Sequence, residues 1–192
     1  MKTLATLVLI FTFTSPVSSV ENHHSPYIGE QHRTIKSLSE RDIDELQQGS
    51  GWGLAKAAEL NGIPGPAHVM EMADALQLTE KQKQAIQHIY HQMKTKAIAL
   101  GKKLIMLESQ LNQAFTNQTI NAEKLTKYVQ QIETVRAHLR ITHLSAHLDT
   151  PNILNTAQTA LYNQLRGYTA DRCQHTPNEH HTKIGHQQHR CR

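Results

Sequence analysis

The chain has few aromatic residues and few cysteines. Phe, Trp and Tyr together make up 5% of its 192 residues, and Cys173 and Cys191 are its only cysteines. Both cysteines lie beyond the last segment with regular apolar spacing, so a disulfide between them would close a loop in the C-terminal tail. With so little aromatic side chain available, we do not expect one short, compact bundle to bury all the apolar residues.

The chain also lacks a strong charge of one sign and, after its first residues, any long apolar run. It has 20 Lys and Arg against 16 Asp and Glu, a formal net charge of +4. This excess is too small to indicate a nucleic-acid partner. No segment after residue 19 approaches the roughly 20 apolar residues that cross a bilayer. The sequence therefore predicts neither nucleic-acid binding nor a membrane span.

The sequence contains no motif that indicates catalysis. A nucleophile motif, a glycine-rich phosphate loop and an HExxH pair are all missing. Ser145 lies between His143 and His147, but a side chain two residues away on a helix points away from both. We therefore expect no enzyme and no organic cofactor.

The first 19 residues, MKTLATLVLIFTFTSPVSS, have the pattern of a secretory signal peptide. Lys2 precedes an apolar run from Leu4 to Thr14, and small residues at Val17 and Ser19 suit a cleavage site. We expect cleavage near Ser19 and export to the bacterial periplasm, an oxidising compartment in which the two cysteines can pair.

Two long helices are the strongest elements that the sequence predicts. Thr79 has the position of an N-cap with Gln82 at N3, the spacing of a capping box, and apolar residues then recur at steps of three and four up to Phe115. Asn121 can cap a second amphipathic helix that ends near Leu148. Because only a short loop joins them, the two helices must lie antiparallel.

Shorter helices are expected on both sides of this hairpin, and strand-like alternation is missing. Helical spacing occurs at residues 39–47, in the turns after residue 54 and from residue 67, and Asn155 with Gln158 at N3 predicts a last short helix. The predicted fold is all-α, a curved helical hairpin with a concave face, as a dimer. Its expected organisation is a signal peptide (1–19), a flexible N-terminal arm (20–37), a helical domain (38–168) and a disordered His/Cys-rich tail (169–192).

Two short motifs carry a family resemblance. Leu78, Thr79 and Gln82 form an LTxxQ motif, and Leu154, Asn155 and Gln158 repeat it with asparagine in place of threonine. Asparagine is as good an N-cap as threonine, so the change is mild. Over residues 38–168 the chain resembles the Spy/CpxP family of periplasmic proteins, which includes a ZraP/CnrX-like heavy-metal resistance or sensor group.

The resemblance implies a fold and two alternative functions. The fold would have about four helices in a hooked hairpin that forms a cradle-shaped antiparallel homodimer. One function is the binding of divalent metal ions in heavy-metal resistance or envelope stress, with a membrane stress sensor as a potential partner. The alternative is a holdase chaperone that binds unfolded client proteins without ATP, on lysine-rich helix faces that can equally be ordinary solvated surface.

Histidine is the compositional outlier, with 14 residues. His143 and His147 are four apart on the second long helix, so both imidazoles can bind one ion, or both can be solvated surface residues. His68 and Glu71 can complete a ligand shell if their helix packs near the end of the second long helix. His88, His91 and His138 are interpreted as surface residues.

The C-terminal tail is a second candidate for metal binding. Flexible tracts rich in cysteine and histidine bind zinc, nickel or copper, and a disulfide would instead remove both thiolates from coordination. The candidate ligands in the tail are Cys173, His175, His180, His181 and Cys191.

Overall fold

A computed structural model describes residues 24–169. The chain divides after His32 into a short N-terminal unit and a larger unit that begins at Arg33. The described part of the N-terminal unit contains one 3-10 turn, η1 (Glu30–His32). The predictions for the signal peptide and for the tail ligands, from Cys173 to Cys191, lie outside the described residues.

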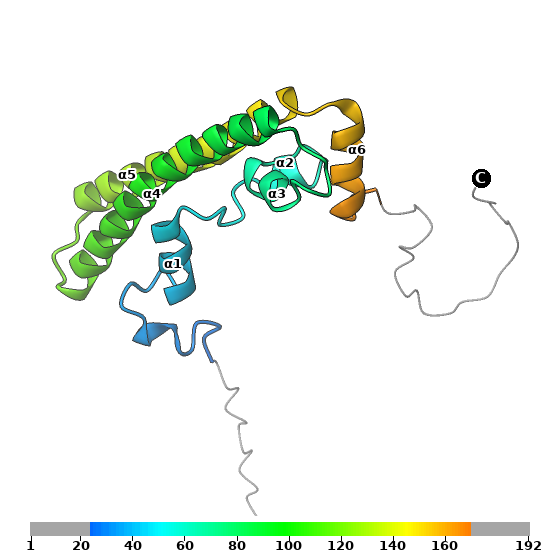
Figure 1. Cartoon of the computed structure of the whole chain (residues 1–192). Helices are drawn as coiled ribbons and strands as arrows, with labels where there is room; N and C mark the ends of the chain where they lie inside the picture. The colour runs from blue at the N-terminus through cyan, green and yellow to red at the C-terminus, as the bar shows by residue number, and fades with distance from the viewer. Residues whose placement is uncertain (1–23, 170–192) are drawn as a thin grey trace, which may run out of the picture. The chain divides into compact units, whose positions relative to one another are not determined.

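The larger unit is built from helices, which confirms the predicted all-α class for residues 24–169, where no strand forms. The described part contains six α-helices, so the expectation of about four was too low (Figure 1). The expectation of about four came from the family resemblance, whereas the helical spacing in the sequence also predicts six segments, including two short ones that Pro64, Gly65 and Pro66 separate. The elements are α1 (Glu40–Gln48), α2 (Lys56–Glu59), α3 (Pro66–Glu71), α4 (Glu80–Thr116), α5 (Ala122–Asp149), η2 (Thr150–Asn152) and α6 (Thr156–Leu165).

The helix starts lie where the capping residues predicted them. Thr79 before α4 and Asn155 before α6 each form a complete capping box with the glutamine three residues later. The Asn121 side chain accepts from the backbone N–H of Lys124 at the start of α5. Each cap satisfies backbone donors that a helix leaves without a partner in its first turn.

Helices α4 and α5 form the predicted antiparallel hairpin (Figure 1). Gln82, near the start of α4, donates to the Ile153 carbonyl oxygen just after α5, at 2.9 Å. Nearer the loop, the guanidinium of Arg136 donates to the Glu108 carboxylate at 2.7 Å. The homodimer and the cradle expected from the resemblance stay predictions, since the structure contains one chain.

The first apolar core lies between α1, α4 and α5. Leu104 and Leu139 from the two long helices are buried there together with Leu46 of α1. Ile35 belongs to the same core, and Lys36 N–H donates to the Asn112 side chain at 3.3 Å. The packed unit therefore begins before residue 38. Residues 33–37, which were expected to belong to the flexible N-terminal arm, are part of it.

The second core joins α3, α6 and the start of α4, and the two motif copies meet there. Leu78 and Tyr162 are buried in it. The Gln82 side-chain amide donates to the Gln158 amide oxygen at 2.8 Å, and the Gln158 amide donates to the Leu76 carbonyl oxygen at 3.2 Å. The N3 residue of each capping box thus also links α4 to α6.

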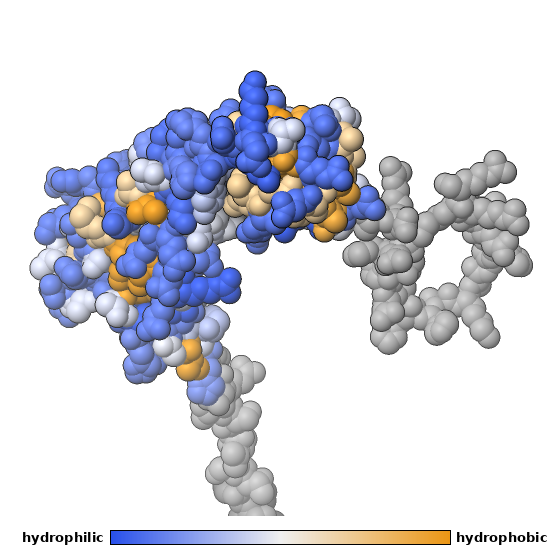
Figure 2. Space-filling view, in the orientation of Figure 1, coloured by the Kyte–Doolittle hydropathy of each residue, from blue (hydrophilic) through white to orange (hydrophobic). Residues whose placement is uncertain are grey.

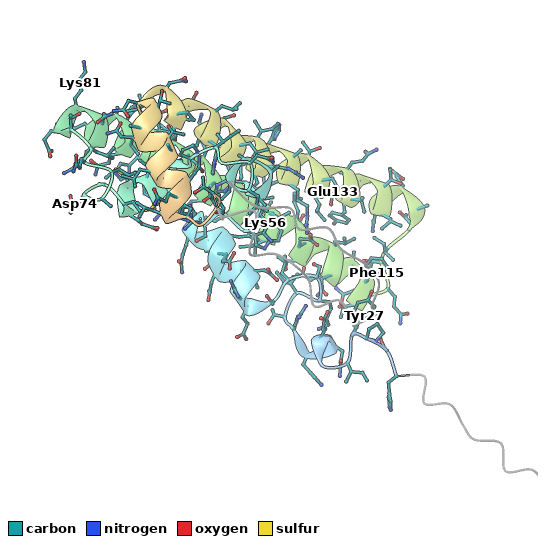
Figure 3. All side chains as sticks on the ribbon, turned by 90° about the vertical axis from the view of Figure 1, so that its right-hand side faces the viewer. Tyr27, Lys56, Asp74, Lys81, Phe115 and Glu133 are labelled. Atoms are coloured by element: carbon teal, nitrogen blue, oxygen red, sulfur yellow. The ribbon has the colours of Figure 1, made fainter. Side chains whose placement is uncertain are left out.

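The surface is mostly hydrophilic, with apolar side chains gathered in a few separate areas of the face drawn in Figure 2. Within residues 24–169, no helix is both long enough and apolar enough to cross a membrane. Figure 3 marks the two ends of α4, with Lys81 near its start and Phe115 near its end.

Gly101→Ala is expected to destabilise the protein. Gly101 on α4 packs directly against the Leu46 carbonyl of α1, and a methyl group at this position would overlap with that carbonyl. Although alanine favours an isolated helix by about 1 kcal/mol over glycine, we expect overpacking to lower the free energy of unfolding by about 1 to 3 kcal/mol. Urea unfolding followed by circular dichroism measures the change.

Gly51→Ala is the matched control, because a methyl group at Gly51 would meet no atom within 4 Å. The packing of α1 on α4 described above would be contradicted by a Gly101→Ala variant as stable as the Gly51→Ala variant.

Candidate functional site

A cavity of about 490 Å³ lies beside α2 and α3 and is also lined by the middle of α4 and the last turns of α5. The loop of residues 48–53 lines one side, and Lys56, labelled in Figure 3, lies on its border. The four ligand candidates that the sequence placed inside the helical domain all line this cavity. They are His68, Glu71, His143 and His147.

His143 and His147 are buried, with 3% and 7% of their surface exposed. The alternative interpretation of this pair as solvated surface residues was therefore wrong. By contrast, His88, His91 and His138 are exposed, as the sequence predicted. Four-residue spacing places His143 and His147 on the same face of α5, and α2 and the segment that leads to α3 cover that face.

The orientation of the His147 ring is fixed by a hydrogen bond to the backbone. Nδ1 lies 2.8 Å from the Ile63 carbonyl oxygen, and since a carbonyl only accepts, Nδ1 carries the proton. The lone pair of the neutral ring is then on Nε2. A Cβ at Gly65 would lie 2.5 Å from this atom, so glycine is required where the chain passes the ring.

His143 has a buried nitrogen with no hydrogen-bond partner. Its Nε2 atom is inaccessible to solvent and contacts no donor or acceptor among the described residues. Burial, and next the charge of the neighbouring His147, lower the pKa of His143 below the usual value, so the ring is neutral near pH 7. A neutral, unpaired imidazole nitrogen is an available metal ligand.

Glu59, in the last turn of α2, is a cavity residue that the sequence analysis missed. Its Oε1 atom accepts from the Tyr162 hydroxyl at 2.8 Å and from the Tyr168 hydroxyl at 2.9 Å. The same oxygen lies 3.0 Å from Nε of Arg166 and 3.2 Å from Nδ1 of His68. The other oxygen, Oε2, is buried without a hydrogen-bond partner and lies 3.9 Å from Nδ1 of His147.

The neighbours of Glu59 keep its carboxyl group ionised. Burial raises the pKa of this carboxyl, but the hydroxyl donors of Tyr162 and Tyr168 and the charges of His68 and Arg166 lower it, and the net pKa is below the usual value. Glu59 therefore stays a carboxylate in the cavity, with one oxygen occupied by several donors and one oxygen available.

The arrangement provides ligand atoms without a preformed coordination sphere. Among residues 24–169, no three His, Cys, Asp or Glu side chains lie close enough together to hold an ion as they stand. Glu71 is exposed, and His68 is partly exposed. An ion bound by more than two of these residues would require side-chain rotations, for which the cavity has room.

Comparisons with known proteins identify no relative: no family model, no curated protein and no solved structure matches the chain. The resemblance carried by the two LTxxQ-like motifs therefore stays a prediction.

His143 is expected to make the metal-free protein less stable in mild acid. Since the pKa of His143 is lowered in the folded state, the unfolded chain takes up a proton at a higher pH than the folded chain does. Stability therefore falls as the pH drops below about 6.5, the ordinary value for histidine. In chelator-treated samples, His143→Leu should lose less stability than the wild type between about pH 7 and 5 in urea unfolding.

The control is His138→Leu, which removes an exposed histidine from the same helix. It should keep the wild-type pH dependence. Parallel curves for the wild type and His143→Leu would show that burial of His143 has no effect on its titration.

Proposed function

We propose that this protein binds a divalent metal ion, zinc, nickel or copper, in the histidine cavity and acts in heavy-metal resistance or envelope stress as a Spy/CpxP-type periplasmic protein. One observation carries the proposal. The buried Nε2 atom of His143 and the buried Oε2 atom of Glu59 have no hydrogen-bond partners and belong to residues that line one cavity. Leaving a buried polar atom unpaired costs about 1 to 3 kcal/mol, which a ligand can recover.

The chemistry of the donors favours borderline divalent ions. Imidazole nitrogen binds zinc, copper and nickel well, whereas magnesium and calcium prefer oxygen ligands. The proposed ligands are His143 and His147 through Nε2, and His68 and Glu71 lie within the same cavity lining. Glu59 would act through His147, because its Oε2 atom lies 3.9 Å from the protonated Nδ1 of that ring. Because α2, α3 and α5 all contribute residues, a bound ion would hold these three helices together.

A second candidate function, the holdase chaperone, is supported by a groove between α4 and α5. The groove has a volume of about 780 Å³, and its lining includes three lysines and no acidic residue. Leu107 and Val135 form apolar floor, and Met106 is 49% exposed. Such a surface suits weak binding of unfolded chains, first through charge and then through apolar contact. The lysines are Lys103, Lys124 and Lys127.

The expected homodimer would double this groove, and the expected membrane stress sensor would respond to metal occupancy. The second copy of the chain and the membrane stress sensor are proposed as partners because the family resemblance implies them.

Zinc titration of the mature chain, residues 20–192, is expected to lose its tightest binding event when His143 and His147 are both replaced by alanine. Removal of the two proposed histidine ligands should weaken this event by more than about 100-fold, which exceeds the loss expected for a residue that only orients a ligand. Isothermal calorimetry with zinc, nickel and copper measures the affinity. A chain that ends at Tyr168 separates this site from the tail ligands.

The matched control is the double variant His88→Ala/His91→Ala, which removes two exposed histidines from α4. It should bind zinc as the wild type does. If binding depends only on the tail, or if both double variants lose it equally, the cavity is not the metal site.

The chaperone alternative predicts that charge reversal at Lys103, Lys124 and Lys127 abolishes suppression of client aggregation while zinc affinity is unchanged. Light scattering of a reduced, aggregating test protein measures this suppression. A control with Lys81→Glu, Lys83→Glu and Lys96→Glu makes the same charge change on α4 outside the groove. Equal loss in both triple variants would indicate a general charge effect, and no suppression by the wild type would remove the alternative.

A further inference from the structure

We propose that Tyr162, Arg166 and Tyr168 are positioning residues that hold Glu59 toward the histidine cavity, so that metal occupancy and docking of the end of α6 strengthen each other. This inference rests on the proposed metal function and identifies how the same site would be regulated. None of the three residues touches the proposed ion; each acts through the Glu59 carboxylate.

The first step of the argument is the asymmetry of the carboxylate. All of the hydrogen bonds to Glu59 end on Oε1, where the two hydroxyls and the guanidinium lie at 2.8, 2.9 and 3.0 Å. A carboxylate held by three donors at one oxygen has little freedom to rotate. Its second oxygen is thereby kept on the side of His147, at 3.9 Å from Nδ1.

The second step is where these donors come from. Tyr162 is completely buried within α6, Arg166 follows the last residue of α6, and Tyr168 comes after the Gly167 turn. The Arg166 guanidinium lies over the Tyr168 ring, 5.6 Å from its centre. The end of α6 thus surrounds Glu59 with three side chains.

The third step is that this end of α6 has few other polar links to α2. The Asn163 side chain donates to the Gly62 carbonyl oxygen at 3.0 Å, directly after α2. At the opposite end of α6, near its start, the Gln158 side chain is hydrogen-bonded to Gln82 of α4 and not to α2. Tyr162 and Tyr168 also pack in the second apolar core. The polar part of the docking of the last turn therefore depends on whether Glu59 is correctly oriented.

The sign of the coupling follows from the role of hydrogen bonds behind a metal ligand. Partners that orient a ligand strengthen binding, and their removal costs roughly 10- to 100-fold in metal affinity. Thermodynamic linkage is reciprocal, so a bound ion must stabilise the docked end of α6 by the same factor. The tyrosines test this best, because loss of a neutral hydroxyl changes orientation without removing a charge that repels the ion.

Tyr168→Phe in the full-length chain is the test variant, since it deletes one hydroxyl and keeps the ring under Arg166. We expect zinc affinity at the cavity to fall about 10-fold. Calorimetry measures it as the binding that the His143→Ala/His147→Ala variant lacks, which separates the cavity from the tail. Tyr128→Phe is the control, because it deletes the hydroxyl of a tyrosine that lines the groove between α4 and α5, outside the histidine cavity.

Hydrogen exchange gives a second readout that a merely structural role would not change. Zinc should slow amide exchange in residues 156–168 of the wild type, and this protection should be smaller in Tyr168→Phe. Unfolding of the metal-free variants in urea shows whether the mutation acts on the fold instead. A second variant, Tyr162→Phe, should have the same direction of effect.

The outcomes separate the two proposals. Zinc affinity unchanged in both tyrosine variants, with binding still dependent on His143 and His147, would overturn the positioning role and leave the metal site intact. Weaker affinity without any protection of α6 by zinc would overturn the coupling. If the wild type has no binding that the double histidine variant lacks, the metal function fails and this inference fails with it.

Discussion

The carboxylate of Glu59 is the contact on which the arrangement around the cavity depends. It accepts hydrogen bonds from the hydroxyls of Tyr162 and Tyr168, which lie 103 and 109 positions later in the chain. It also lies beside His68 of α3 and His147 of α5. A buried charge is tolerated only when it is paired and hydrogen-bonded, and here the partners come from separate helices. The position of α2 relative to α6 and α5 is therefore set by the need to satisfy one ionised group.

The two glutamines of the repeated motif provide a second link of the same kind. Each acts as a local cap, because its side-chain oxygen accepts from the backbone N–H of the N-cap residue of its own helix. The nitrogen of the same amide donates to a carbonyl oxygen in the segment that precedes the other helix. Because one amide group serves both purposes, the beginning of α4 and the beginning of α6 are fixed against each other. This contact positions α6 so that its last turn reaches Glu59.

Much of the fold could be predicted from the sequence, but only part of the cavity. The caps at Thr79, Asn121 and Asn155 and the apolar spacing located the helices because these signals are local. The pairing of His143 with His147 followed from helical periodicity. Glu59 gave no such signal, because a glutamate in a short polar helix is normally a surface residue and its partners are distant in sequence. The close packing at Gly101 was missed for the same reason.

The most direct test of this account is nitrogen-15 NMR of the histidine rings during zinc titration. Coordination at Nε2 changes the chemical shift of that atom, and the His143→Ala and His147→Ala variants assign the signals. The account predicts that the Nε2 signals of His143 and His147 shift together and saturate at one equivalent of zinc, while that of exposed His138 does not change. It would be contradicted if both cavity signals stayed unchanged while zinc bound elsewhere on the chain.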